Sequence, residues 1–153
     1  MRNAEEILNM KDYEIISVSP ETTISEALQL MIKNQVGAML IKDKDEIVGI
    51  WTERDLMRNT VTAGFDPKTA KIGDYMTTGL LSAPHDNSCY ELLDKFLGMR
   101  LRHLLIMKEE KYIGLVSIGD VIKSCLQAKD EELRKLNKFV SWEYYENWRW
   151  TKK

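Results

Sequence analysis

An internal repeat with a spacing of 65 residues is the feature that most limits how this chain can fold. A phrase that reads EIVGIWTERDLMR at residues 46–58 returns as KYIGLVSIGDVIK at residues 111–123. The repeat places Gly49 on Gly114, Thr52 on Ser117 and Asp55 on Asp120. Each copy is a short β-rich run that ends in a hydroxyl residue, two variable positions and an aspartate, after which a helix is expected. The chain therefore consists of two copies of one structural unit.

Each copy also carries an amphipathic helix and short apolar strands around the repeated phrase. Apolar residues follow the 0, 3, 4, 7, 8 spacing of one helix face at residues 24–32 and again at residues 89–97. Both helices open on a capping box, which runs from Thr23 to Glu26 and from Ser88 to Glu91. Short apolar runs predict a first strand at residues 14–18 and 79–83, and a second strand at residues 38–41 and 103–107. Each unit is predicted to run strand, helix, strand, strand, helix.

These motifs, in this order, resemble a tandem pair of CBS (cystathionine-β-synthase type) domains. The resemblance rests on VSPETTISEALQLM, VGAMLIKD and IVGIWTERDL in the first copy, and on MTTGLLSAP, RLRHLLIM and YIGLVSIGDVIK in the second. It implies an α+β fold in which two βαββα units pack about a pseudo-two-fold axis. The predicted divisions are a first unit with an entry helix at 1–60, a linker at 61–71, a second unit at 72–126 and a C-terminal helical tail at 127–153.

Composition and charge exclude some classes of function. Hydrophobic residues make up 44% of the chain and charged residues 30%, as in an ordinary globular domain. The net charge is −2, whereas a general binder of nucleic-acid backbones concentrates Lys and Arg over a whole face, so nucleic acid is not expected as a partner. The first residues lack the apolar core of a signal peptide and no apolar run approaches a membrane span, so no membrane contact and a cytoplasmic location are expected.

Catalytic and metal-binding motifs are absent from the sequence. There is no glycine-rich phosphate loop, no HExxH and no GxSxG, and His85 and His103 are the only histidines. Cys89 and Cys125 occupy apolar helical positions without CxxC spacing, so we interpret both as core residues. The chain is therefore predicted not to be an enzyme, and to require no metal or cofactor.

The repeated hydroxyl-x-x-Asp motif has two interpretations. Thr52 to Asp55 and Ser117 to Asp120 fit a helix-capping box. However, the two other boxes use Glu, whereas both of these use Asp, which favours a second role. An ionised carboxylate only accepts hydrogen bonds, and its two oxygens suit the two hydroxyls of a ribose. The resemblance implies the same role, with the Asp holding the ribose of an adenine nucleotide and the Ser or Thr assisting. We favour the ligand role, and capping stays open.

The resemblance further implies two clefts, each lined by the Asp end of one unit and by the first strand and helix-to-strand corner of the other. The Asp120 cleft, with Ser117 and Gly119, would include Ile16, Val18, Gly37 and Ala38. The Asp55 cleft, with Thr52 and Arg54, would include Leu80, Leu81, Arg102 and His103. Gly37 and Ala38 would leave room for a flat base, while Arg102 and His103, helped by Arg54 or Arg58, would bring positive charge to phosphates. Gly119 stands where the first copy has Arg54, so the clefts are predicted to be inequivalent. Trp51 is interpreted as core in preference to a base-stacking residue.

The predicted function is a regulatory module that senses an adenosine-containing ligand, namely AMP, ADP or ATP, with NADH and S-adenosylmethionine as further candidates. The alternative is a structural or protein-interaction adaptor that acts through dimerisation and its tail. The tail concentrates aromatic residues, namely Phe139, Trp142, Tyr144, Tyr145, Trp148 and Trp150. Because monomers seldom expose large apolar patches, the tail is expected to fold over its own units or to cross to a second copy. We predict a homodimer in which it crosses.

Overall fold

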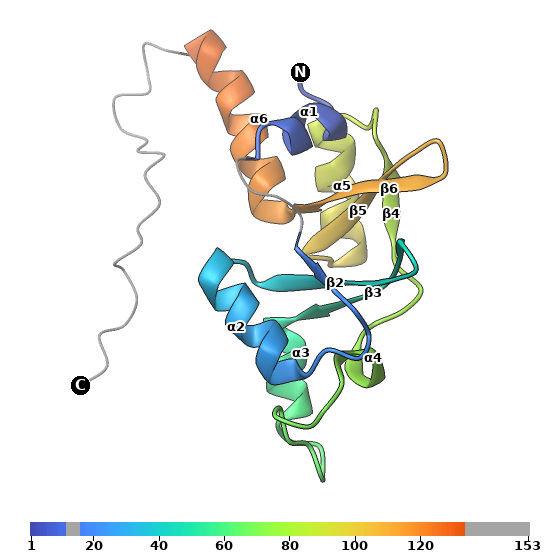
Figure 1. Ribbon diagram of the computed structural model, residues 1–153. Helices are drawn as coiled ribbons and strands as arrows, with labels where there is room; N and C mark the ends of the chain where they lie inside the picture. Colours follow the sequence, from blue (N-terminus) through green and yellow to red (C-terminus); the bar gives the residue numbers. More distant parts are fainter. Residues whose placement is uncertain (12–15, 134–153) are drawn as a thin grey trace, which may run out of the picture.

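Two small sheets, each covered by helices on its outer side, make up the protein. The computed structural model describes residues 1–11 and 16–133, with side chains described up to residue 129. Figure 1 shows four layers: helices, the second sheet, the first sheet, and helices again. The predicted α+β fold of two βαββα units is confirmed.

The first unit contains β1 (Ser17–Val18), α2 (Ile24–Asn34), β2 (Ala38–Asp43), β3 (Glu46–Thr52) and α3 (Glu53–Asn59), and helix α1 (Ala4–Asn9) precedes it in the chain. The second unit contains β4 (Ser82–Pro84), α5 (Cys89–Met99), β5 (His103–Lys108), β6 (Lys111–Ser117) and α6 (Ile118–Leu133), and helix α4 (Ile72–Tyr75) precedes it. The sheet orders are β1-β2-β3 and β4-β5-β6, with the first pair parallel and the second antiparallel in each.

The first strands differ from the prediction. Strand β4 begins at Ser82, three residues later than predicted, and it includes Pro84. Proline is tolerated there because β4 is an edge strand, and on its outer side no neighbouring strand needs a hydrogen bond from the missing N–H. Strand β1 covers Ser17 and Val18, while residues 14 and 15 of the predicted strand lie outside the described residues. Helix α6 continues to Leu133, past the predicted boundary at 126, because this stretch contains no Gly or Pro to end it.

Local backbone geometry repeats along with the sequence. The capping boxes of α2 and α5 form as predicted, and Asn3 and Glu6 form a third at α1. Within the described part of the chain, six non-glycine residues adopt positive φ, and they fall into three pairs that are 65 residues apart: Gln35 and Arg100, Lys44 and Glu109, Asp45 and Glu110. The first pair ends α2 and α5, and the others form two-residue hairpin turns of the kind that requires positive φ at both positions. The two hairpin turns therefore adopt positive φ with residues other than glycine.

The helices that precede the two units are exchanged between them. Ala4 and Ile7 of α1 are buried in the core of the second unit, although α1 belongs to the first repeat in the sequence. Conversely, Ile72 of α4 is buried in the core of the first unit, together with Trp51. Backbone bonds hold each exchanged helix, for example from the amide of Ala4 to the carbonyl of Asn87 (2.9 Å). Each core is therefore completed by a helix from the other repeat.

The two sheets face each other across a thin apolar layer. Leu40 and Leu105 are 1% and 2% exposed, yet neither belongs to the two helix-covered cores. Successive side chains of a strand point to opposite faces, and Met39 and Ile41 point into the first core. Leu40 must therefore point towards the second sheet, and by the same alternation Leu105 points towards the first.

Candidate functional site

The two repeated aspartates lie where a buried strand passes into a helix. Asp55 accepts a hydrogen bond from the amide of Thr52 through Oδ2 (2.8 Å) and a second from the Thr52 hydroxyl (3.1 Å). Asp120 accepts from the amide of Ser117 through Oδ2 (2.8 Å), and its own amide donates to Ser117 Oγ (3.1 Å). The capping role is therefore present at both. It does not exclude a ligand, because a carboxylate offers about four lone-pair sites and these bonds use only part of them.

The helix-to-strand corners lie beside the hydroxyl residue of their own unit, and their predicted place in the cleft of the other unit stays a prediction. Ala38 pairs with Thr52 across β2 and β3, and the amide of Glu53 donates to the carbonyl of Gly37 (3.0 Å). In the second unit, His103 pairs with Ser117 and the amide of Ile118 donates to the carbonyl of Arg102 (3.0 Å). Sequence analysis had assigned each corner to the opposite cleft. Antiparallel pairing of the second and third strands makes each corner a neighbour of its own hydroxyl residue.

One oxygen of Asp55 is not used for capping. Oδ1 of Asp55 lies 3.9 Å from the guanidinium of Arg58, too far for a hydrogen bond. The Asp55 side chain is 15% exposed, whereas the Arg58 side chain is 72% exposed. Arg54 is exposed as well. A Cβ added to Gly37 would lie 3.0 Å from Oε1 of Glu53, so the Glu53 carboxylate lies directly over this glycine. The Asp55 site thus combines a mostly buried carboxylate, one oxygen of which is not used for capping, with two exposed arginines and one acidic side chain.

The surroundings of Asp120 are occupied. Lys11 Nζ lies 2.7 Å from Oδ2 of Asp120 and donates to the carbonyl of Leu115 (2.7 Å). Burial lowers the pKa of His103, and the charges of Lys11 and Arg102 lower it further against the opposing effect of Asp120. The lowered pKa favours the neutral imidazole at neutral pH, and the predicted contact of His103 with a phosphate stays a prediction. Arg102 is exposed. A Cβ added to Gly119 would lie 3.6 Å from Oγ of Ser117.

The first-strand residues that were assigned to the clefts have structural roles. Ile16 and Val18 pack against the core of the first unit, so part of their surface is structural. The carbonyls of Ile16 and Leu81 accept from the amides of Leu40 (3.4 Å) and Leu105 (3.3 Å) in their own sheets. Leu81 is 50% exposed and Leu80 is half-buried, so both retain surface for a ligand. Their contact with the aspartate of the other unit stays a prediction.

The segment before each first strand crosses to the other unit, which brings in residues that sequence analysis missed. Lys11 reaches β6 of the second unit, and Thr77 forms two backbone hydrogen bonds with Ile50 of β3 in the first (2.8 and 3.1 Å). Lys11 and Met76 are equivalent in the repeat, being 65 residues apart, so a cation stands where the other copy has an apolar residue. This difference between the two copies is the sequence feature that could have indicated Lys11 as a site residue. Glu53 carried a similar signal, because Ile118 stands in its place in the second copy.

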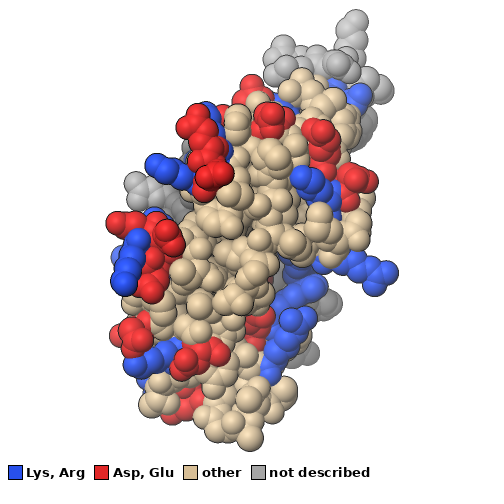
Figure 2. Space-filling view, turned by 90° about the vertical axis from the view of Figure 1, so that its right-hand side faces the viewer, with Lys and Arg blue, Asp and Glu red and all other residues tan. Residues whose placement is uncertain are grey.

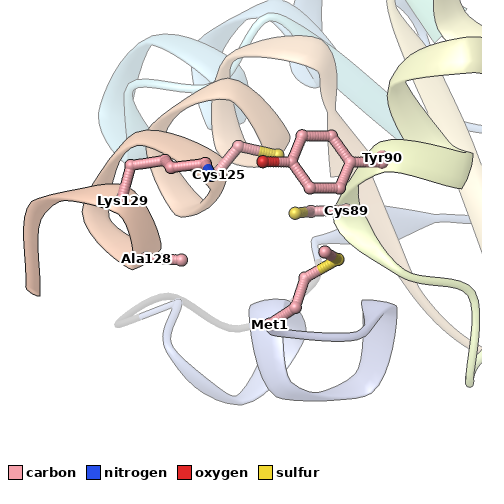
Figure 3. A pocket seen from close by; sticks show the side chains of 6 residues that line it. All are labelled: Met1, Cys89, Tyr90, Cys125, Ala128 and Lys129. Carbon is pink, nitrogen blue, oxygen red and sulfur yellow. The ribbon is translucent and has the colours of Figure 1, made fainter. Parts of the chain in front are cut away.

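A small cavity near the N-terminus is not a nucleotide site. It has a volume of about 110 Å³, and it lies between α1, α5 and α6 with Met1, Cys89, Tyr90, Cys125, Ala128 and Lys129 as lining residues (Figure 3). Ligand pockets usually measure roughly 300–1,000 Å³, so this one is too small for a nucleotide. Cys89 and Cys125 are buried, as predicted, and burial together with a hydrogen bond to Cys89 raises the pKa of Cys125 to about 12. Such a thiol is unreactive at neutral pH.

On the face drawn in Figure 2, acidic and basic side chains are interspersed around a broad uncharged region, unlike the continuous basic face of a nucleic-acid binder. Among residues 1–11 and 16–133, no group of three or more His, Cys, Asp or Glu side chains is placed to hold a metal ion. Within the same residues, no helix is long and apolar enough to cross a membrane.

Two interlocked units, built from duplicated sequence and carrying a capping aspartate each, define a tandem α+β repeat protein. The family model of the CBS domain matches residues 4–61 and 72–127. The chain therefore belongs to the CBS domain family and contains two CBS domains.

Similar proteins share this organisation. The CBS domain-containing protein CBSX3, mitochondrial, of Arabidopsis thaliana is 31% identical over 129 residues, which cover 81% of this chain and 63% of CBSX3, less than two thirds of its length. The structure of a protein with CBS domains from Burkholderia ambifaria is 28% identical and matches 93% of this chain and 100% of its own, with a TM-score of 0.78.

Two more distant structures share the fold. A CBS domain protein of Pyrobaculum aerophilum complexed with AMP has a TM-score of 0.68 at 17% identity, over 82% of this chain and 99% of that one. A CBS domain pair in complex with 5′-methylthioadenosine and S-adenosyl-L-methionine also has a TM-score of 0.68, at 19% identity, over 84% of this chain and 98% of that one.

Proposed function

We propose that the protein is a regulatory module without catalytic activity that binds an adenosine-containing ligand, with AMP as the first candidate, at the Asp55 site. The observation that carries this proposal is the Asp55 carboxylate, which has one oxygen engaged in capping and the other 3.9 Å from an exposed arginine. Two structures of the same fold, described above, were solved with AMP or with adenosine-derived ligands, which supports the ligand class.

The chemistry of the site suits a nucleoside phosphate. Oδ1 of Asp55 can accept from ribose hydroxyls while Oδ2 keeps its capping bonds to Thr52. Arg54 and Arg58 lie on the same helix, α3, and their exposed side chains can turn to form charge-assisted pairs with a phosphate. The Glu53 carboxylate would have to leave the surface of Gly37 before a base could stack there. Binding would then shift the equilibrium between two arrangements of the units only by the difference in the ligand's affinity for them.

Replacement of Asp55 tests the proposal. Asp55→Ala removes hydrogen bonds to a charged acceptor, which are worth roughly 1.5–3 kcal/mol, so the affinity for AMP should fall about tenfold to a hundredfold. Asp55→Asn keeps an oxygen that can accept the capping bonds, so the start of α3 should stay intact. This variant should still bind AMP more weakly, which distinguishes a lost ligand contact from a disrupted helix. Asp43→Ala, an exposed residue at the end of β2, is the matched control and should bind like the natural chain.

Binding is measured by calorimetry, after a thermal-shift screen of AMP, ADP, ATP, NADH and S-adenosylmethionine, with GMP for comparison. Urea unfolding of each variant gives its stability separately. If AMP binds equally well to the natural chain and to the double variant Asp55→Ala/Asp120→Ala, the aspartates only cap their helices and the proposed function is wrong. In that case the adaptor function, which needs no ligand, takes its place.

The working form in this proposal is a homodimer. Large apolar side chains are exposed at equivalent positions of the two repeats, including Ile32 (75%) and Leu97 (71%) on α2 and α5. Monomeric proteins seldom leave such surface uncovered, and aromatic residues are enriched at interfaces. The aromatic tail at residues 139–153 lies outside the described residues, and we propose that it contributes to the contact between the two copies.

A further inference from the structure

The ion pair between Lys11 and Asp120 differs from the other ion pairs of the described residues in its burial. The Lys11 and Asp120 side chains are 14% and 22% exposed, and the two charged atoms are 2.7 Å apart. The same ammonium donates to the carbonyl of Leu115 at 2.7 Å. A largely buried pair of this kind is strongly held, because removing one partner leaves the other charge without compensation in a poorly solvated place.

This ammonium lies against the carboxylate that a ligand would need. Oδ2 of Asp120 already accepts from the amide of Ser117, so Lys11 adds a second strong donor to the carboxylate that would accept ribose hydroxyls. A neutral hydroxyl pair forms weaker bonds to a carboxylate than an ammonium does, so a ribose would have to compete with the stronger donor for Asp120. Burial of the pair also means that bulk water does little to release the lysine.

Among the described residues, the first unit has no equivalent ion pair. Met76, which lies 65 residues after Lys11, packs its side chain against Gly49 of β3. The segment that carries Met76 is held by backbone hydrogen bonds between Thr77 and Ile50. The cation paired with Asp55 is Arg58 of α3, which is 3.9 Å away and mostly exposed. The two sites therefore differ in the cation that faces the aspartate, in addition to their differences at Arg54 and Gly119.

We propose that Lys11 is an internal occupant of the second site, which closes that site to nucleotides and limits the chain to one ligand, at Asp55. The proposal rests on the proposed function, since it assumes that a nucleotide binds to the open site. The two sites are then inequivalent because of the crossing segment of the first unit, and Lys11 determines how many nucleotides each chain binds.

The test is the number of AMP molecules bound to each chain, measured by calorimetry on the full-length protein. The natural chain should bind one AMP, and Lys11→Met, which copies the residue of the other repeat, should bind two. Asp55→Ala should weaken binding tenfold or more, whereas Lys11→Met/Asp55→Ala should regain one site through Asp120. Lys33→Met, which removes an exposed lysine on α2, is the matched control and should still bind one.

The outcomes separate this proposal from the proposed function. Binding of two AMP molecules by the natural chain, or loss of its single site in Asp120→Ala with no effect of Asp55→Ala, would overturn the role of Lys11 and leave nucleotide binding intact. A stoichiometry of one in a stably folded Lys11→Met would also overturn it. The absence of AMP binding in every variant would overturn both. Urea unfolding of Lys11→Met and Asp120→Asn shows whether either variant has lost its fold.

Discussion

His103 shows how one side chain can have a role opposite to that suggested by its residue type. It lies at the start of β5 beside Ser117, where burial, Lys11 and Arg102 all disfavour its charged form and Asp120 favours it. The net result is a pKa below the ordinary value of 6.5. The neutral imidazole is thus favoured beside Asp120, and Lys11 is the cation that pairs with this carboxylate.

This lowered pKa predicts a dependence of stability on pH. Below about pH 6.5 the unfolded chain binds a proton at His103 more readily than the folded chain does, so the free energy of unfolding decreases as the pH falls. His103→Gln removes this contribution and should lose less stability between about pH 7.5 and about pH 5.5 than the natural chain. Urea unfolding across this range measures the difference. Equal slopes for the two proteins would show that His103 titrates in the same way in the folded and unfolded states.

At the scale of elements, the crossing segment of the second unit explains the glycine of the repeated phrase in the first copy. Met76 of the second unit lies on Gly49 of β3, and a Cβ at Gly49 would be 2.8 Å from Cγ and 3.0 Å from Cβ of Met76. The segment cannot simply move away, because Thr77 is bonded to Ile50 through both its amide and its carbonyl. Gly49 is therefore required by close packing between the two units.

Gly49→Ala should consequently destabilise the protein by about 1–3 kcal/mol, the usual cost of overpacking. Gly98→Ala is the matched control, because Gly98 lies in α5 with no atom within 4 Å of the added Cβ. In a helix this second change should be neutral or should stabilise by up to about 1 kcal/mol. Urea unfolding distinguishes the two substitutions. If both substitutions changed the free energy of unfolding equally, the crossing segment would be able to move away from Gly49 easily, and it would not hold the two units together.

Much of the element order was predictable from the sequence, because each part of it depends on local chemistry. The capping boxes at Thr23 and Ser88, the second strands predicted at 38–41 and 103–107 and the burial of Trp51 follow from spacing and residue type alone. The position of α1 in the core of the other unit does not, because an amphipathic helix carries no label for the surface that it covers. The contacts of Lys11 and His103 could not be predicted for the same reason. Strand register, which brought His103 to Ser117, and chain crossing, which brought Lys11 to Asp120, are properties of the packed structure.

At the scale of the whole molecule, the exchange of α1 and α4 makes the two units one body. Each core contains a buried isoleucine from the other repeat, Ile7 in the second unit and Ile72 in the first, so neither core is complete alone. Leu40 and Leu105 fill the layer between the sheets. A ligand at one aspartate would therefore act on a continuous packed structure, in which a shift of one unit must move segments held by the other.

The outer helical layers of this body remain partly apolar, and this leads to a prediction about assembly. Besides Ile32 and Leu97, the exposed apolar residues include Met57 (66%) with Ile122 (42%), and Val61 (86%) with Leu126 (48%), each pair being 65 residues apart. Repetition of the same exposed positions in both units provides a surface that a second copy can cover with matching contacts. We therefore expect the full-length protein to be a dimer at micromolar concentration, with the aromatic tail adding to the contact.

Removal of residues 139–153 should weaken this association about tenfold or more, equivalent to about 1.4 kcal/mol, while the circular dichroism of the two units stays unchanged. Ile32→Glu with Leu97→Glu should also weaken it, because charges would be buried without partners. Gln29→Glu adds a charge to an exposed position of α2 and is the control, which should associate normally. Light scattering and sedimentation measure the outcome. If the full-length protein is monomeric at micromolar concentration, the tail does not cross to a second copy, and it must cover its own helices or bind another protein.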